Sequence, residues 1–317
     1  MRTLLATLII FLTAITLLAE GGLAANQYNG FDVSNSLIPK DEIFSGGPPR
    51  DGIPAILNPK FESAEKASGW LNDSDLVAGI DDGSVQKTYP LRILVWHEAV
   101  NDTVGGRPVL VSYCPLCGST LIFSREIDGR TLSFGISGLL YQSDVLFYDH
   151  QTESLWSQLE MKAVSGKMAG TEFDILPSTL ATWGEWKEKH PGTLVLSRDT
   201  GFSRDYGNQP YSGYERSASV MFPIKHKSDR FHPKEKVLVV LSGGDVKAYP
   251  FSELEKTATP LKDELGGRNI VIKYEDGKYV GAYDEADRPV KSFVTYWFAW
   301  YTFRPDTPVF SSAEDAG

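Results

Sequence analysis

Most of the chain consists of short runs of β-branched, aromatic and other apolar residues, separated by Gly, Pro and Asp. Such runs are typical of β-strands, and the clearest are Arg107–Tyr113, Ser119–Ser124, Thr131–Ile136 and Val237–Leu241. Helical spacing is found in Phe61–Leu71 and again after Ser178, a good N-cap residue, with a stop at Pro191-Gly192. The pattern therefore predicts an α+β fold, predominantly antiparallel β, with a few short helices.

Two stretches of the sequence resemble each other. Tyr89-Pro90 in the first stretch matches Tyr249-Pro250 in the second, and Gly105-Gly106-Arg107 matches Gly266-Gly267-Arg268. The distance from Tyr-Pro to Gly-Gly-Arg is 16 residues in one stretch and 17 in the other. A repeat at this long period indicates duplication of a domain half. We therefore expect two structurally related halves.

The repeat also predicts local structure and a difference between the halves. LRILVWHEA, from Leu91 to Ala99, has no clear period, but its counterpart FSELEKTA is helical in pattern and follows Pro250. A short helix is therefore expected in both places. His97, Cys114 and Cys117 occur in the first half and have no equivalents in the second. This asymmetry suggests that a site was added to one copy of a duplicated scaffold.

The start of the chain predicts export. An apolar run from Leu4 to Leu18 follows Arg2 and is short for a membrane span, and Gly22-Leu23-Ala24 offers a small-x-small cleavage site. We interpret residues 1–24 as a signal peptide, with an uncleaved anchor as the alternative. The expected product is periplasmic or extracellular and not stably inserted in the membrane. Its remaining parts are an extended arm (25–59), a first half containing the CPLCG motif, inserted hairpins and a helix (60–235), and a second half (236–317).

Charge and motifs exclude several functional classes. The formal charge of -10 disfavours nucleic acid as a partner. The sequence contains no GxSxG, HExxH, P-loop or complete Rossmann fingerprint. No enzyme class is predicted on these grounds, and whether the protein is an enzyme stays open.

Cys114 and Cys117, the two cysteines of the chain, form a CPLCG motif between two predicted strands. Pro115 and Gly118 suit the tight turn of a metal knuckle. A thioredoxin-type pair would instead open a helix, but the residues after Gly118 predict a strand. Because a tetrahedral all-cysteine site needs two knuckles, a metal here must recruit another ligand type, and His97 is the leading candidate.

Two thiolates and one imidazole suit copper, or zinc with a further ligand. We therefore predict a metal site of Cys114, Cys117 and His97, serving metal handling or transfer with a protein that donates or accepts the ion. Alternatives are a thiol–disulfide redox pair, a cysteine nucleophile, or a structural disulfide, which gains only about 2 kcal/mol in so short a loop. For His97, the alternatives to a metal ligand are a structural histidine bonded to a backbone carbonyl and a catalytic base. Asp144 is read as an ordinary edge-strand residue, or as a carboxylate behind the metal ligands.

Three stretches carry a resemblance to a known family. They are YPLRILVWHEAVNDTVGGRPVLVSYCPLCGSTLIF, SGLLYQSDVLFYDHQTESLWSQ and YWFAWYTFRPDT. The chain resembles an exported prokaryotic family of unknown function, DUF3179, over about residues 70–310. Its pattern matches here at His97-Glu98, Asn101-Asp102, Cys114 to Gly118, and Trp156. The resemblance implies no activity.

Overall fold

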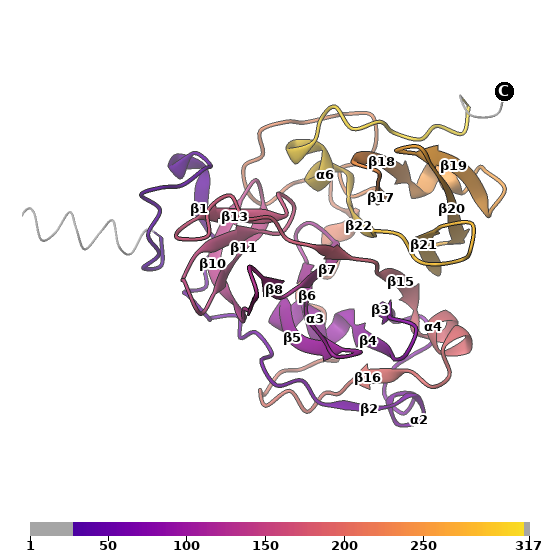
Figure 1. The fold of residues 1–317 in the computed structure, drawn as a ribbon, viewed down its shortest axis with the longest axis horizontal. Helices are drawn as coiled ribbons and strands as arrows, with labels where there is room; N and C mark the ends of the chain where they lie inside the picture. The colour runs from indigo at the N-terminus through magenta and orange to yellow at the C-terminus, as the bar shows by residue number, and fades with distance from the viewer. Residues whose placement is uncertain (1–27, 314–317) are drawn as a thin grey trace, which may run out of the picture.

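The structure is a computed structural model that describes residues 28–313. It consists mostly of antiparallel strands with a few short helices, as the sequence predicts (Figure 1). Within the described residues, no helix has the length and apolar character needed to cross a membrane. The predicted signal peptide, residues 1–24, lies outside the described residues.

A five-stranded antiparallel sheet lies at one end of the molecule (Figure 1). Its order is β1 (Ile43–Ser45), β10 (Phe134–Tyr141), β11 (Asp144–Asp149), β12 (Leu155–Ser157) and β13 (Lys162–Ser165). Every residue of β10 and β11 is buried, because neighbouring elements cover both faces of these strands. A small separate hairpin is formed by β8 (Glu126–Ile127) and β9 (Arg130–Thr131). The strand predicted over Thr131–Ile136 is therefore split between β9 and β10.

A seven-stranded sheet forms the centre of the molecule. Its order is β18 (Asp245–Pro250), β17 (Lys236–Ser242), β22 (Ser292–Tyr296), β7 (Ser119–Ser124), β6 (Arg107–Cys114) and β5 (Ala99–Val104), with β14 (Ile175–Leu176) also paired to β7. All of its pairs are antiparallel. The strands predicted at Arg107–Tyr113, Ser119–Ser124 and Val237–Leu241 are confirmed.

An eight-stranded sheet completes the β-structure of the described residues. Its order is β19 (Leu261–Leu265), β20 (Arg268–Glu275), β21 (Tyr279–Tyr283), β15 (Thr179–Thr182), β3 (Leu76–Asp81), β4 (Gln86–Pro90), β16 (Leu194–Leu196) and β2 (Phe61–Ser63). Only β16 and β4 pair in parallel.

The repeated sequences form equivalent elements. A hairpin that ends in Tyr-Pro leads into a helix, which is α3 (Leu91–His97) in one copy and α5 (Phe251–Leu254) in the other. A second hairpin with a Gly-Gly turn follows, β5–β6 in one copy and β19–β20 in the other. The helix predicted from Leu91 is thus confirmed in type, and it ends two residues earlier than expected.

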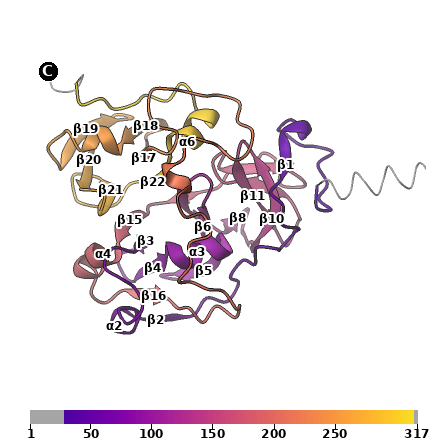
Figure 2. The ribbon, with the colours of Figure 1, turned by 180° about the vertical axis from the view of Figure 1, so that it is seen from behind.

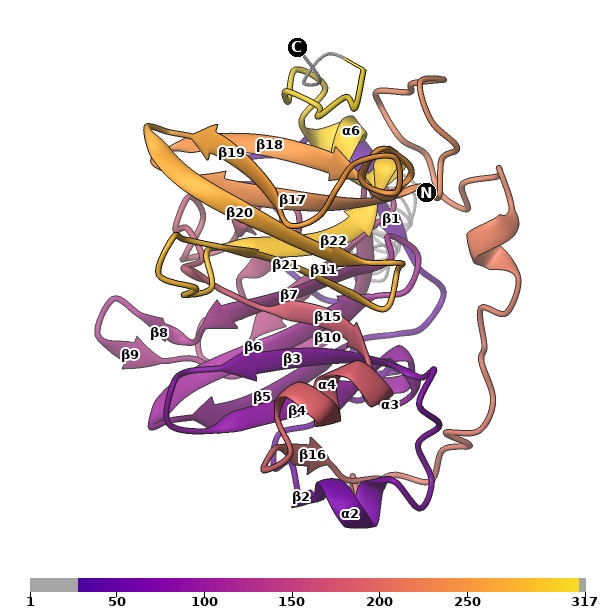
Figure 3. The ribbon, with the colours of Figure 1, turned by 90° about the vertical axis from the view of Figure 1, so that its right-hand side faces the viewer.

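The equivalent hairpins are exchanged between the two large sheets. β3–β4 of the first copy shares a sheet with β19–β21 of the second, and β17–β18 of the second shares a sheet with β5–β7 of the first (Figure 3). One apolar core therefore contains residues of both copies, such as Phe123 and Phe293. The halves share their sheets and are not separate bodies.

The remaining helices are short. They are α2 (Ala64–Ala67), α4 (Trp183–Lys189), α6 (Trp297–Phe303) and the 3-10 turns η1 (Lys40–Glu42) and η2 (Tyr214–Arg216). The predicted N-cap at Ser178 is wrong, because the next residues form β15 and Thr182 accepts the capping hydrogen bond from the Glu185 N–H. A long irregular segment between β16 and β17 runs over one side of the molecule (Figure 2).

Candidate metal centre

The CPLCG motif forms the tip of the β6–β7 hairpin, as predicted. Cys114, the last residue of β6, pairs with Ser119, the first residue of β7. Gly118 has a φ of 57°, in the left-handed region that favours glycine. A Cβ at this position would lie 2.6 Å from the Tyr296 ring. Both the backbone conformation and the close ring therefore require glycine.

Hydrogen bonds from β22 fix the tip of this hairpin. The Cys117 carbonyl oxygen accepts the Tyr296 N–H at 2.8 Å and the Thr295 hydroxyl at 3.1 Å. The Cys117 thiol donates to the Ser143 carbonyl oxygen at 3.3 Å. Cys114 and Cys117 are both free thiols, with 1% and 0% of their surfaces exposed. The cysteine pair is therefore held rigidly inside the protein.

The third member of the site comes from another hairpin. Asp144 is the first residue of β11 and is fully buried. One Sγ from each cysteine and one Asp144 carboxylate oxygen all lie within 4.8 Å of one another. The edge-strand interpretation of Asp144 is wrong, because β11 lies between β10 and β12. The sequence did suggest Asp144 as a carboxylate behind the ligands, and the structure places it among the possible ligands.

The turn that delivers Asp144 is strained. Gln142 and Ser143 form the two-residue link between β10 and β11, with φ of 52° and 66°. Hairpin turns with two left-handed residues strongly prefer Asn-Gly. Strained non-glycine residues of this kind tend to accumulate at functional sites. Here the strained Ser143 carbonyl is the group that contacts Cys117.

A second turn connects Asp144 to the cysteine hairpin. The Leu159 N–H and the Ser157 hydroxyl donate to one oxygen of Asp144, Oδ2, at 2.9 and 3.3 Å. Between them in sequence, Gln158 Nε2 donates to the hydroxyl of Ser112 on β6 at 2.8 Å. The same short segment therefore positions both parts of the site.

Burial changes the protonation of the site. It raises the pKa of Asp144 to about 7, against the opposing effect of the hydrogen bonds from Leu159 and Ser157. Burial, and then the Asp144 charge, raise the pKa of Glu98 to about 8. Burial, the Cys114 thiol and the Asp144 charge raise the pKa of Cys117. Without a cation, the site thus favours neutral, protonated groups.

The sequence offered Glu98 only as a possible triad partner of His97 and not as a metal ligand. It ends α3 with a φ of 57°, a left-handed conformation that is uncommon for glutamate. Its carbonyl accepts the Tyr113 N–H at 2.8 Å. Within residues 28–313, its buried carboxylate accepts no hydrogen bond. Glu98 is thus a buried acid in a strained conformation beside the strand of Cys114. Its place next to His97 in the family pattern was the sign of it in the sequence.

Several buried polar atoms around the site lack partners among the described residues. They are Asp144 Oδ1, Ser143 Oγ and the Tyr214 hydroxyl. Nearby, Cys117 raises the pKa of Tyr214, after burial as the main cause. Unsatisfied buried polar groups are rare in proteins and are costly. Their concentration here fits a site completed by a ligand.

The structure does not bring His97 into the Cys114–Cys117–Asp144 group. His97 is fully buried, with Nδ1 2.7 Å from the Pro54 carbonyl oxygen and Nε2 2.8 Å from the Tyr206 hydroxyl. Burial lowers the pKa of His97, which favours the neutral ring. These contacts match the structural interpretation that the sequence also allowed.

Most of the chain matches a known protein family. A family model described as "Protein of unknown function (DUF3179)" matches residues 50–286. The chain belongs to the DUF3179 family. No curated protein and no solved structure matches the chain. Among the DUF3179 motif residues, Asn101 on β5 pairs with the backbone of Phe134 on β10 and so joins two sheets, whereas Trp156 donates to Asp149 within the five-stranded sheet.

Proposed function

We propose that the protein binds one metal ion through Cys114, Cys117 and Asp144. The observation that carries the proposal is the convergence of their three ligand atoms within 4.8 Å, with Asp144 Oδ1 buried and unpartnered. A cation there would replace the protons that burial now favours on these groups. It would also pair the one carboxylate oxygen that hydrogen bonds leave free.

The donor set favours zinc as the first candidate. Zinc accepts thiolate and carboxylate ligands together, whereas Cu(I) selects thiolates and gains little from a hard oxygen. Glu98 lies near enough for the Asp144 charge to raise its pKa, and it is the candidate for completing the coordination. Copper bound by Cys114 and Cys117 alone is the competing assignment, and Asp144 distinguishes the two metals.

Burial supports a resident ion more than a transferred one. Cys114, Cys117 and Asp144 are at most 1% exposed, so a partner protein has no direct access to the ligands. The same burial, with the raised pKa of Cys117, disfavours the thiol–disulfide alternative, which needs an accessible thiolate. In the exported compartment that the sequence predicts, bound metal would also protect the two thiols from oxidation.

The proposal is tested by competition titration of metal-free protein with Zn(II) and with Cu(I) against chromophoric chelators. The variants are Cys117→Ser and Asp144→Asn. The control is Asp263→Asn, which removes a carboxylate from the second half, far from the cysteine pair in sequence. We expect one zinc per chain, with affinity reduced at least a hundredfold in both variants and unchanged in the control.

Two outcomes would overturn the zinc assignment. Copper binding that is lost in Cys117→Ser and unchanged in Asp144→Asn would assign the site to Cu(I). Absence of binding for either metal, with both thiols reduced and titratable, would remove the metal proposal and leave redox chemistry as the function of the pair.

A further inference from the structure

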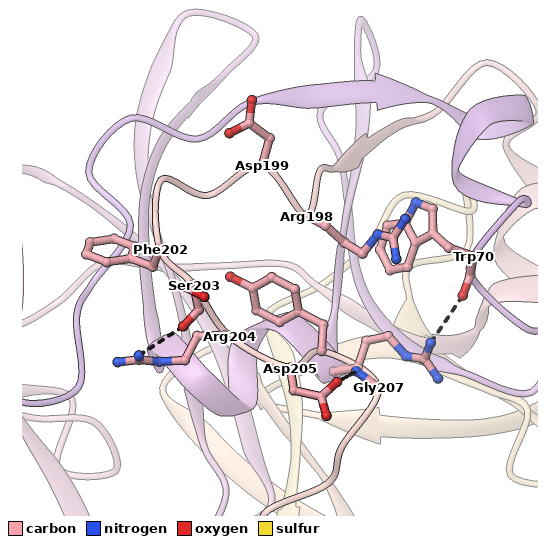
Figure 4. Close-up of a pocket in the computed structure, with 10 residues that line it drawn as sticks. Trp70, Arg198, Asp199, Phe202, Ser203, Arg204, Asp205 and Gly207 are labelled. Carbon is pink, nitrogen blue, oxygen red and sulfur yellow. Dashed lines mark hydrogen bonds between the residues drawn. The ribbon is translucent and has the colours of Figure 1, made fainter.

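A surface cavity of about 500 Å³ is lined by none of the candidate metal ligands. It is lined by the segment that follows β16, by Arg92 of α3, and by Trp70, which follows α2. The residues that give it chemical character are three arginines and three aromatics: Arg92, Arg198, Arg204, Trp70, Phe202 and Tyr206. Figure 4 shows the cavity with its lining side chains.

Positive charge in the cavity is only partly neutralised. Arg92 pairs with Asp75 at 2.8 Å, while its Nε is buried and has no partner within the described residues. Arg198 and Arg204 form no ion pair with any carboxylate of residues 28–313. Both side chains are exposed to solvent, and in a chain with a formal charge of -10 they concentrate positive charge in one cavity, where they are available to an anionic ligand.

The two aspartates that line the cavity offset the charge of these arginines only in part. Asp199 is engaged by Lys60 at 2.7 Å, and Figure 4 shows its carboxylate directed away from the other labelled side chains. Asp205 accepts the N–H of Gly207 at 3.0 Å, which closes a local turn. The charge available to a ligand is therefore positive.

The aromatic residues hold the cavity in shape. The Arg198 guanidinium lies 4.9 Å from the centre of the Trp70 ring, a cation–π contact that orients its donors. The Tyr206 hydroxyl is held by His97 Nε2 at 2.8 Å and by the Thr200 hydroxyl at 2.5 Å. Phe202 packs on the His97 ring, with 5.5 Å between ring centres. The wall is thus ordered before any ligand arrives.

We propose that this cavity binds a small organic anion, with a carboxylate or phosphate held by Arg198, an apolar or planar body against Trp70, Phe202 and Tyr206, and Arg204 adding positive charge to the lining. Arginine presents a planar fork of donors that matches both acid groups. The cavity volume falls within the range of about 300–1,000 Å³ found for small-molecule sites. This role also explains why His97 is held in place, because His97 positions Tyr206 in the cavity wall. The inference does not depend on the metal proposal.

The test is calorimetric titration at low ionic strength with four probes: phenyl phosphate, benzoate, inorganic phosphate and the neutral benzyl alcohol. The variants are Arg198→Gln and Arg204→Gln. The control is Arg130→Gln, which removes an exposed arginine from the β8–β9 hairpin. We expect an aromatic anion to bind at least tenfold more tightly than benzyl alcohol or inorganic phosphate. Its affinity should fall at least tenfold in both cavity variants and stay within twofold in the control.

The probe that binds best identifies the acid group, and a preference for either phenyl phosphate or benzoate supports the proposal. Arg198→Lys keeps the positive charge but removes the planar guanidinium with its paired donors. An affinity between those of the native chain and Arg198→Gln would separate the contribution of hydrogen-bond geometry from that of charge. No saturable binding of either aromatic anion would overturn the proposal. So would a loss of binding that is equal in the cavity variants and in Arg130→Gln. Melting temperatures of all variants within a few degrees of the native chain would show that folding is intact.

Discussion

The thiol of Cys117 lies 3.3 Å from the carbonyl oxygen of Ser143, the residue before Asp144. This contact joins the tips of two hairpins, β6–β7 of the seven-stranded sheet and β10–β11 of the five-stranded sheet. The candidate metal centre therefore lies where two sheets meet. Its three ligands can converge only when both sheets are folded and packed, so metal binding and packing of these sheets should stabilise each other.

The buried acids predict how the stability of the metal-free protein depends on pH. Asp144 has a pKa of about 7 in the folded state against a usual 3.8, and Glu98 about 8 against 4.5. The folded state therefore binds more protons than the unfolded state between these values, and stability falls as pH rises from about 4 to 8. Urea unfolding at several pH values measures this loss.

Asp144→Asn should flatten that profile. The substitution removes one of the two acids. Between pH 4 and 8, the free energy of unfolding of the metal-free variant should therefore fall by on the order of 3 kcal/mol less than that of the native chain. Asp263→Asn, outside the site, serves as the control and should retain the native profile. Parallel profiles for the native chain and Asp144→Asn would contradict the assignment of a raised pKa to Asp144.

His97 is predicted to support the fold and not the metal. His97→Ala removes the bonds to Pro54 and Tyr206 and should lower the free energy of unfolding by roughly 2–4 kcal/mol. Zinc affinity should stay within threefold of the native value. Tyr206→Phe removes one of the same bonds and should cost less. A tenfold loss of zinc affinity in His97→Ala, absent in Tyr206→Phe, would instead make His97 a ligand.

Ser143→Gly should stabilise the metal-free protein. The substitution relieves a left-handed φ of 66° and deletes a buried hydroxyl that has no described partner. We expect a gain of about 1–2 kcal/mol in thermal or urea unfolding. Asp276→Gly, at a left-handed turn residue on the surface, is the control and should gain only the backbone part. A loss of stability in Ser143→Gly would show that the hydroxyl has a bound partner.

The two halves provide a matched comparison of one interaction. The Tyr89 hydroxyl donates to Asp102 at 2.6 Å, and the equivalent Tyr249 hydroxyl donates to Asp263 at 2.7 Å. Each aspartate also pairs with a lysine at 2.8 Å. The Asp102 side chain is 7% exposed and that of Asp263 is 19% exposed. Asp102→Ala should therefore cost about 3–4 kcal/mol and Asp263→Ala about 1–2 kcal/mol. Equal losses would show that burial does not set the strength of this interaction.

Sequence patterns predicted the elements that depend on residues close together in the chain. The strands that flank Cys114 and Cys117, and the turn between them, follow from apolar runs and from Gly118 within a few residues. The repeat predicted that Leu91 begins a helix, because its counterpart in the second half has a clearer pattern. It did not predict that the hairpins of the halves are exchanged between sheets, since such pairing depends on contacts far apart in sequence.

The candidate ligand set was harder to predict for the same reason. His97 is 17 residues before Cys114 and was chosen by spacing, whereas Asp144 reaches the cysteines from a different sheet. A sign of its role was present in the sequence, because Asp144 is a charged residue between the apolar runs SGLLY and VLF. Charged residues inside buried strands are rare unless they are paired. Glu98 gave no comparable sign, since its burial follows from the end of a helix.

Elemental analysis of the purified protein, combined with a thiol count after unfolding, distinguishes a bound metal ion from an oxidised cysteine pair. We expect one zinc per chain and two reduced thiols, and a metal content near zero in Cys117→Ser and Asp144→Asn, whereas Asp263→Asn keeps the ion. A metal-free protein in which Cys114 and Cys117 form a disulfide would contradict the metal proposal.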